Sequence, residues 1–344
     1  MSVNSHFIPQ FLLKGFAFRQ KGGQAYVHVF RKGCAPFSPN TKGVAAPRNF
    51  YGDETVEQTL AVIETQFSML VQRLREGDCA SNTKPLIDRF VAHSLIRTQA
   101  FRDGVHDIGT TVLKEGFQEF LNPEYTPQLL AKLVEDAMSE PAVRDMLAAA
   151  PPEVRPVIET KMREILLHPD MHEKLRQMIL PNLNAIDTAA SARSAQRQAL
   201  EDDRNLDKRV RDLGEITWSI ETYKAHALIL GDIGPLVRDD ESGEWGRIFH
   251  GMPQMIWFPL SNHSLLIGKA SGSATRPDFE EVNLASAENS IEFFVASQRT
   301  QREDEYQRRI GSRIDRTTSE QLSELKRTVR EYLTTPGGAL TTES

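Results

Sequence analysis

The sequence predicts an α+β protein in which a mainly helical body carries a small antiparallel sheet built from N-terminal and C-terminal segments. Three observations support this fold class. Alternating apolar residues, many of them β-branched or aromatic, occur near the N-terminus at residues 25–31. Similar runs return after Gly214. Between these regions, apolar residues recur at the helical spacings of three and four.

The N-terminal region is predicted to be short and irregular. Residues 6–16 form a helical turn, since Pro9 suits the first turn and Gly15 can end it. Residues 25–31 form a strand, and residues 33–52 form a loop interrupted by Gly and Pro.

The clearest helix is expected over residues 53–76, and a second helical stretch over 85–122. The apolar stripe of the first consists of Val56, Leu60, Ile63, Phe67, Leu70, Val71 and Leu74. Residues 123–211 are rich in Ala and charge and are divided by prolines, which start or stop helices. The strongly polar residues 187–213 suit either a long exposed helix or one through which the protein oligomerises.

Strands are expected again at 217–223, 225–230, 254–259 and 264–268. A helix capped by Asn283 should run to Ala296, and a last amphipathic helix should cover 303–333. These elements suggest a core α+β domain from 1–122 and 214–300, a helical insertion at 123–213, and a C-terminal helix and tail at 301–344.

Composition excludes several classes of protein. The 344 residues include 41 Lys and Arg against 47 Asp and Glu, with 40% apolar residues, which does not fit a disordered chain. No apolar run is long enough to span a bilayer, and the N-terminus does not look like a secretory signal. Two cysteines cannot form a disulfide framework or a four-thiolate zinc site, so no metal site is assigned. We therefore expect a cytoplasmic protein without membrane contact; its cofactor stays open.

The net charge of −6 hides an asymmetry. Residues 1–52 contain seven Lys or Arg and no Asp or Glu, so this segment carries +7 and the remainder −13. Such a basic segment can attract a polyanion, and nucleic acid is the expected partner. Alternatively, the basic strands simply pack against acidic helices.

The opening segment His-Phe-Ile-Pro-Gln-Phe-Leu-Leu-Lys-Gly-Phe, residues 6–16, resembles the signature of a bacterial family known as domain of unknown function 4238. Further pieces follow in the same order as in that family: Tyr26 and Val27 in a strand, Glu57 and Glu64 on a helix, Arg97, the turn from Asp232 to Pro235, residues 258–261 and the Asn283 helix. The resemblance covers about half the chain and leaves out residues 123–210. It implies no reaction, but it indicates which residues to examine.

Three residues are candidates for catalysis. His6 can act as an acid or base near neutral pH, or it satisfies a buried carbonyl. Glu64 can serve as a base or a metal ligand. Asp232 follows an apolar strand, where a turn would expose its carboxylate for catalysis, unless it only bonds its own turn. If it is catalytic, Asp232→Asn should abolish activity and leave the melting temperature nearly unchanged.

Three further residues are candidates for substrate binding. Lys14 lies in the basic segment, and Arg97 can clamp a phosphate with two parallel hydrogen bonds. His263 is a candidate partner for Asp232. The alternatives are a Glu64–Arg97 pair that joins two helices and an ordinary loop histidine at position 263.

These observations favour a hydrolase that acts on nucleic acid, either a nuclease or a DNA glycosylase. The family's bacterial setting suggests a role in defence against foreign phage DNA. The alternatives are a non-catalytic module that binds nucleic acid or protein, and a small-molecule hydrolase. The hydrolase hypothesis requires His6, Glu64, Arg97 and Asp232 to meet in one cleft.

Overall fold

The computed structural model describes residues 6–47, 50–51, 54–110, 131, 134–135, 138–166, 168, 170, 173–174, 177–178, 181–182, 185–201, 203–224, 227–238, 245–246, 253–270, 276–313 and 327. Most of the helix expected at 303–333, and the end of the stretch expected at 85–122, lie outside the described residues. Among the described helices, none is long and apolar enough to cross a membrane.

The chain divides into two compact units. One comprises Met1–Val105 with Ala189–Thr318, and the other His106–Thr188 with Ser319–Ser344. The expected insertion, 123–213, thus differs from the observed division at both ends. Residues 189–213 belong with the first unit because α10 (Thr188–Glu201) is anchored to it: the buried Gln196 side chain donates to the carbonyls of Ile96 and Thr98, each at 2.9 Å.

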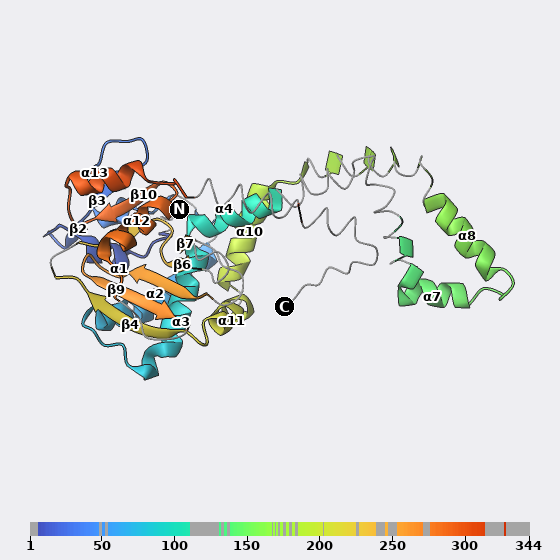
Figure 1. Ribbon diagram of the computed structural model, residues 1–344, viewed down its shortest axis with the longest axis horizontal. Coiled ribbons are helices and arrows are strands. Elements are labelled where there is room, and N and C mark those ends of the chain that lie inside the picture. Colours follow the sequence, from blue (N-terminus) through green and yellow to red (C-terminus); the bar gives the residue numbers. More distant parts are fainter. Residues whose placement is uncertain are drawn as a thin grey trace. The chain divides into compact units, whose positions relative to one another are not determined.

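A three-stranded sheet joins the two ends of the chain, as the sequence predicts. Its order is β3 (His28–Arg31), β10 (Phe293–Ala296) and β5 (Leu230–Gly231), and both pairings are antiparallel. Figure 1 labels β3 and β10 side by side. Phe30 and Phe294 stack in register with their ring centroids 4.9 Å apart. The helices α12 (Phe279–Asn289) and α13 (Gln301–Arg308) cover this sheet and share a small apolar cluster with it.

A larger antiparallel sheet has five strands in the order β4-β9-β8-β6-β7. The strands are β4 (Thr217–Thr222), β9 (Ser264–Lys269), β8 (Met255–Pro259), β6 (Leu236–Arg238) and β7 (Trp245–Gly246). Residues along β8 and β9 are buried on both faces, so this sheet lies inside the main core. The sequence indicates several of these strands, but it does not indicate that they form a sheet of their own.

The basic N-terminal segment contains a two-stranded hairpin, β1 (Arg19–Lys21) and β2 (Gln24–Tyr26). Gly22 and Gly23 form its turn with φ values of 57° and 74°, which favour glycine in a two-residue hairpin loop. The strand expected at 25–31 is therefore two strands, β2 and β3. Between them Val27 turns inward and its N–H donates to the carbonyl of Pro39 at 3.2 Å.

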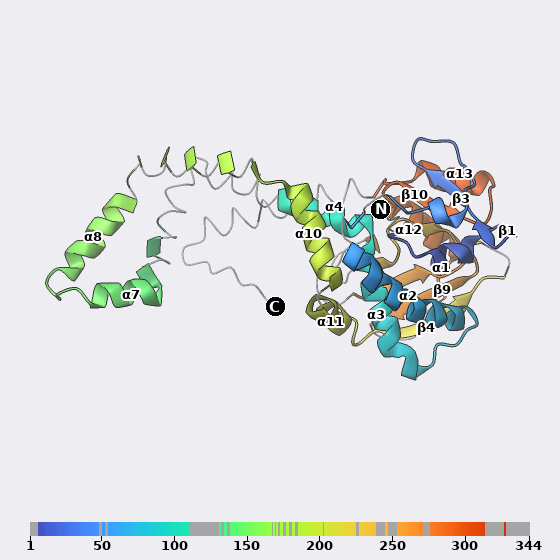
Figure 2. The same cartoon turned by 180° about the vertical axis from the view of Figure 1, so that it is seen from behind.

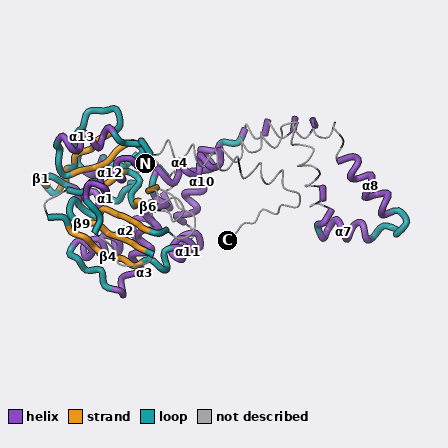
Figure 3. The backbone as a smooth tube through the Cα atoms, viewed as in Figure 1, coloured by secondary structure: helices purple, strands orange, loops and turns teal. Residues whose placement is uncertain are grey.

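Helices surround these sheets (Figure 3). The helix α2 (Glu54–Arg75) lies within the expected range 53–76 and contacts β9 and α3 (Figure 2). The stretch expected from 85 is broken at Thr98, whose extended backbone separates α3 (Lys84–Arg97) from α4 (Gln99–Thr110). Beyond α10 follows α11 (Asp203–Asp212), and the second unit includes α7 (Pro141–Ala148) and α8 (Arg155–Leu166).

The helix expected from Asn283 to Ala296 is wrong in both its start and its end. α12 begins at Phe279, where the Asp278 side chain accepts a hydrogen bond from the N–H of Glu280, and it ends at Asn289. Asn283 lies inside the helix, fully buried, and bonds the backbone of Ala227 and Ile229.

Candidate functional site

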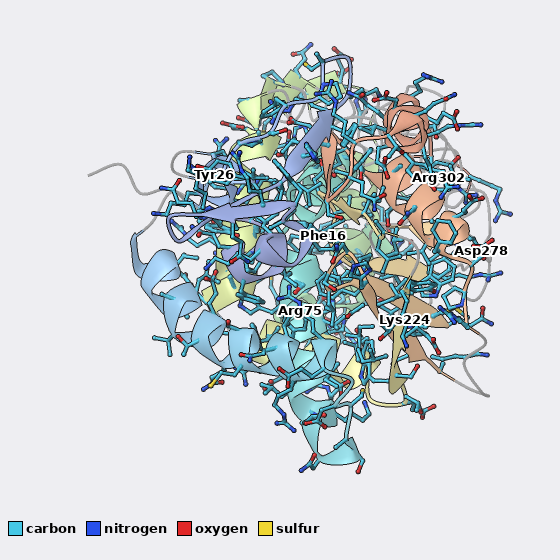
Figure 4. The ribbon with its side chains drawn as sticks, turned by 90° about the vertical axis from the view of Figure 1, so that its left-hand side faces the viewer. Phe16, Tyr26, Arg75, Lys224, Asp278 and Arg302 are labelled. Atoms are coloured by element: carbon cyan, nitrogen blue, oxygen red, sulfur yellow. The ribbon has the colours of Figure 1, made fainter. Side chains whose placement is uncertain are left out.

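The signature segment folds around a half-buried arginine. After Pro9 the chain forms α1 (Gln10–Leu13) and the short 3₁₀ helix η1 (Lys14–Phe16). Arg75, near the end of α2, donates to the carbonyls of Phe11 at 3.0 Å and Leu260 at 2.6 Å (Figure 4 labels Arg75 and Phe16). A Cβ on Gly15 would lie 2.7 Å from the Leu260 oxygen, so only glycine fits this close approach.

A cleft of about 540 Å³ lies between this segment and α2. The signature segment contributes three polar residues to its wall: the candidates His6 and Lys14, and their neighbour Gln10. Glu64 lies on the α2 side, and Arg97 reaches the wall from the end of α3. The other lining residues are Phe11, Leu60, Ala61, Thr65, Ser68 and Met69. Four of the six candidate residues therefore meet in one place.

Arg97 holds the backbone of His6 and the carboxylate of Glu64 in place. Its side chain is 3% exposed and donates to the carbonyl oxygen of His6, from Nη2 at 2.6 Å and from Nε at 3.0 Å. Nη2 also forms an ion pair and hydrogen bond with Oε1 of Glu64. This geometry fits the alternative expectation, a Glu64–Arg97 pair that joins two helices, because Nε and Nη2 of the guanidinium already have partners. Arg97 is a positioning residue.

The imidazole of His6 has an unused nitrogen. Its Nε2 is buried and has no hydrogen-bond partner among the described residues, which is uncommon for a buried polar atom. Burial lowers the pKa of His6, and the nearby Arg97 charge lowers it further. The Glu64 carboxylate and backbone groups of Thr41 and Lys42 oppose this shift. At neutral pH the ring is therefore uncharged and can accept a proton.

Glu64 and Lys14 supply the charges that a bound molecule would meet. The Glu64 side chain is 30% exposed, so its carboxylate reaches the cleft while Arg97 holds one oxygen. Lys14 is exposed and forms no ion pair with any residue that the structure describes. The cleft thus combines a fixed carboxylate, a neutral imidazole and an exposed cation.

Asp232 does not line this cleft, and the expectation that a turn exposes its carboxylate is wrong. The residue is 3% exposed, and its oxygens accept hydrogen bonds from the N–H groups of Ile291, Glu292 and Phe293 at 2.8, 2.6 and 3.1 Å. Burial raises the pKa of Asp232 to about 6, although the three N–H donors favour the ionised form. The carboxylate fixes the turn that leads into β10. The requirement that His6, Glu64, Arg97 and Asp232 share one cleft is therefore met by the first three residues only, and a hydrolase built on this cleft has to work without Asp232.

His263 also lies outside the cleft. Its ring Nδ1 is 2.8 Å from the carbonyl oxygen of Tyr223, and its own carbonyl accepts the N–H of Tyr223 at 2.8 Å. Both contacts join the turn between β8 and β9 to the end of β4. His263 is an exposed loop histidine, and it does not pair with Asp232, whose carboxylate binds the backbone N–H groups of residues 291–293.

Several lining residues were not singled out from the sequence. Thr65 and Ser68 follow Leu60, Ala61 and Glu64 at helical spacing, so the i, i+4 pattern around Glu64 could have indicated them. Tyr51 donates to the carbonyl of Arg97 at 3.2 Å, a contact that no sequence pattern signals. The side chain of Glu57 lies outside the described residues. Among the residues that the structure describes, no group of three or more His, Cys, Asp or Glu side chains is placed to hold a metal ion.

Comparison with known proteins gives one match. A family model described as "Protein of unknown function (DUF4238)" matches residues 4–305, which include the whole cleft. No curated protein and no solved structure matches the chain.

Proposed function

We propose that this chain, which belongs to the DUF4238 family of proteins of unknown function, is a hydrolase that removes a base from DNA in the cleft between η1 and α2. The observation that carries the proposal is the buried, unpartnered Nε2 of His6 in a wall that also presents the Glu64 carboxylate fixed by Arg97. A neutral imidazole beside a fixed carboxylate is a common arrangement for acid–base hydrolysis.

The proposed reaction is hydrolysis of the bond between a base nitrogen and C1′ of the sugar. A water oxygen forms a bond to C1′ while the C1′–N bond breaks, and the base leaves with that electron pair. Nε2 of His6 takes a proton from the attacking water and returns a proton, through solvent, to the departing base nitrogen, so the ring ends neutral as it began. The Glu64 carboxylate stabilises the positive charge that develops on the sugar, much as a carboxylate does in glycoside hydrolysis.

Two features favour a base–sugar bond over a phosphodiester. Positive charge builds up on the sugar when a base–sugar bond is hydrolysed. The cleft wall presents the Glu64 carboxylate to such a charge, while its partner Arg97 is buried. The volume of about 540 Å³ lies within the range of sites that enclose one small ligand, such as a single nucleotide turned out of a strand. Deoxyribose lacks the 2′-hydroxyl that would disfavour this cation, so the base–sugar bond of DNA is the easier one to hydrolyse.

A direct test uses the whole chain and labelled DNA oligonucleotides with ordinary and modified bases, with and without EDTA and alkali. Strand breaks that appear only after alkali report abasic sites and support the proposal. Breaks without alkali would instead identify a nuclease. No change in any oligonucleotide would favour a binding module or a small-molecule hydrolase. Including phage-type modified bases also tests the suggested role in defence.

Variants of the cleft make this test specific. Glu64→Gln and His6→Gln should each lower the rate by roughly 10²–10⁴-fold, as expected when a positioned acid–base group is lost. Glu76→Gln, in the exposed turn just after α2, and His263→Gln in the β8–β9 turn are matched controls and should keep full activity. Equal loss in controls and cleft variants would contradict the assignment.

A further inference from the structure

The outer face of the N-terminal hairpin combines aromatic rings with cations. This hairpin surface consists of Phe18, Arg19, Lys21, Tyr26 and His28. The rings of Phe18 and His28 are stacked with centroids 4.1 Å apart and an interplanar angle of 10°. The Arg19 guanidinium lies 4.7 Å from the centroid of the Tyr26 ring, which is paired with it across β1 and β2. Phe18 is 38% exposed, so an apolar ring faces solvent here.

The cations of this region are available to a ligand. Lys14, Arg19, Lys21 and Lys42 are exposed, and none of them forms an ion pair with another residue in the part of the chain that the structure describes. Arg31, at the end of β3, differs because Glu292 lies 3.9 Å from it. Since residues 1–52 contain no Asp or Glu, the positive charge of the hairpin surface is not neutralised from within its own segment. It is therefore complementary to a polyanion.

The hairpin adjoins the segment that lines the cleft. The 3₁₀ helix η2 (Thr41–Gly43) contacts both β2 and α1, which places the exposed Lys42 between them. Lys14 lies on the cleft wall, only five residues before Arg19. Figure 4 shows Tyr26 on this hairpin, on the opposite side of the view from Lys224, Asp278 and Arg302. A ligand that enters the cleft beside Lys14 would thus extend over the hairpin.

We propose that the hairpin surface binds single-stranded DNA and guides it past Lys42 and Lys14 into the cleft, an inference that rests on the proposed base-removing function. Unpaired bases stack on exposed aromatic rings, whereas the bases of a duplex are already stacked on each other. Arg19 and Lys21 would contact phosphates on either side of a stacked base. A base must also leave a duplex before it can reach an enclosed site.

Fluorescence anisotropy with a labelled twelve-nucleotide oligothymidylate tests this surface without requiring turnover. Phe18→Ala should weaken binding roughly tenfold, as expected for the loss of one stacking ring, and Phe18→Leu, which keeps an apolar side chain, should also weaken it. Arg19→Ala combined with Lys21→Ala should reduce the slope of log affinity against log salt by about 1.4, or about 0.7 per phosphate contact. The matched controls are Leu284→Ala, whose side chain is 37% exposed, and Lys224→Ala. Both should bind within about twofold of the parent chain, because neither residue belongs to the hairpin surface on which bases stack.

Three competitors define the partner. A duplex of the same sequence and a polyglutamate of equal charge should each compete at least about tenfold more weakly, because neither offers unpaired rings to stack. Oligouridylate should compete no better than the DNA strand. Binding that is absent at 50 mM salt, unchanged in the hairpin variants, matched by the duplex or the polyglutamate, or exceeded by oligouridylate would overturn the inference. Hairpin-dependent binding by a chain that never releases a base would overturn only the proposed reaction.

Discussion

Nη2 of Arg97 lies 2.6 Å from the carbonyl oxygen of His6, so a buried guanidinium at the end of α3 fixes the backbone of a residue 91 positions earlier. The same guanidinium holds Glu64 on α2. One arginine therefore determines how the N-terminal signature, α2 and α3 meet at the cleft. Because the guanidinium bridges a carbonyl and a carboxylate, its planar fork matters as well as its charge.

Loss of the Arg97 side chain should be strongly destabilising. Arg97→Ala leaves the Glu64 carboxylate and the His6 carbonyl without their donor, and breaking a buried pair in this way typically costs about 3–5 kcal/mol. Arg73→Ala is the control, because Arg73 pairs with Asp78 at the surface and such pairs contribute about 1 kcal/mol or less. Urea unfolding of both variants measures the difference. Similar losses in the two variants would contradict the bridging role.

Asp232→Ala should destabilise the fold without damaging the cleft. The substitution leaves three buried or half-buried N–H groups without an acceptor, and one such unsatisfied group costs about 1–3 kcal/mol. The free energy of unfolding is measured by urea titration, and activity is measured per folded molecule. A variant as stable as the parent but inactive would restore Asp232 as a catalytic candidate.

Gly15→Ala should disturb the Arg75 contacts. The new Cβ would lie 2.4 Å from Nη2 of Arg75 and 2.7 Å from the Leu260 oxygen, so the chain must shift, and such overpacking typically costs about 1–3 kcal/mol. Gly43→Ala is the control, since its Cβ would meet nothing within 4 Å and its φ is not positive. Melting temperatures of both variants provide the comparison. Equal melting temperatures would show that the close approach at Gly15 is not needed.

His93 should make the fold sensitive to acid. Burial lowers its pKa to about 3, with Arg97 and Arg89 adding to the shift. Because its folded pKa is below its unfolded pKa of about 6.5, the unfolded chain binds more protons between these values, and stability falls as the pH drops through this window. From pH 6.5 to pH 5 the loss should approach about 2 kcal/mol, at about 1.4 kcal/mol per pH unit.

His93→Leu isolates this effect. The variant cannot take up the proton, so its free energy of unfolding should depend less on pH than that of the parent over this range. Asp232 is present in both proteins, and its contribution, which has the opposite sign because its pKa is raised, cancels in the difference. Parallel curves of unfolding free energy against pH would contradict the assignment to His93.

Much of the cleft follows from local patterns. The signature at 6–16 and the stripe of α2 place Lys14 and Glu64 on elements that periodicity can identify. A motif shared with a family directs attention to His6 and Arg97. The role of Arg97 could not be predicted, because its partners lie 91 and 33 residues away and only the packing of α2 against α3 brings them together.

Other predictions from the sequence are wrong or incomplete for identifiable reasons. The sequence around Asp232 does not indicate whether the turn after its strand is exposed or covered. In the structure, residues 291–293 cover it. The helical spacing of Ile291, Phe294 and Val295 is also compatible with a buried strand. Pairing with β3 and β5 makes residues 293–296 the strand β10. The five-stranded sheet depends on register between strands, which single-strand patterns do not specify.

Single-turnover release of a base by the parent chain and by Glu64→Gln is the most direct test of the cleft as a catalytic site. A panel of single-stranded oligonucleotides with ordinary and modified bases would be incubated with each protein and treated with alkali. We predict alkali-dependent breaks with the parent chain and a rate lower by roughly 10²–10⁴-fold with Glu64→Gln. A parent chain that releases no base from any oligonucleotide, or a Glu64→Gln variant as fast as the parent, would contradict the proposed function.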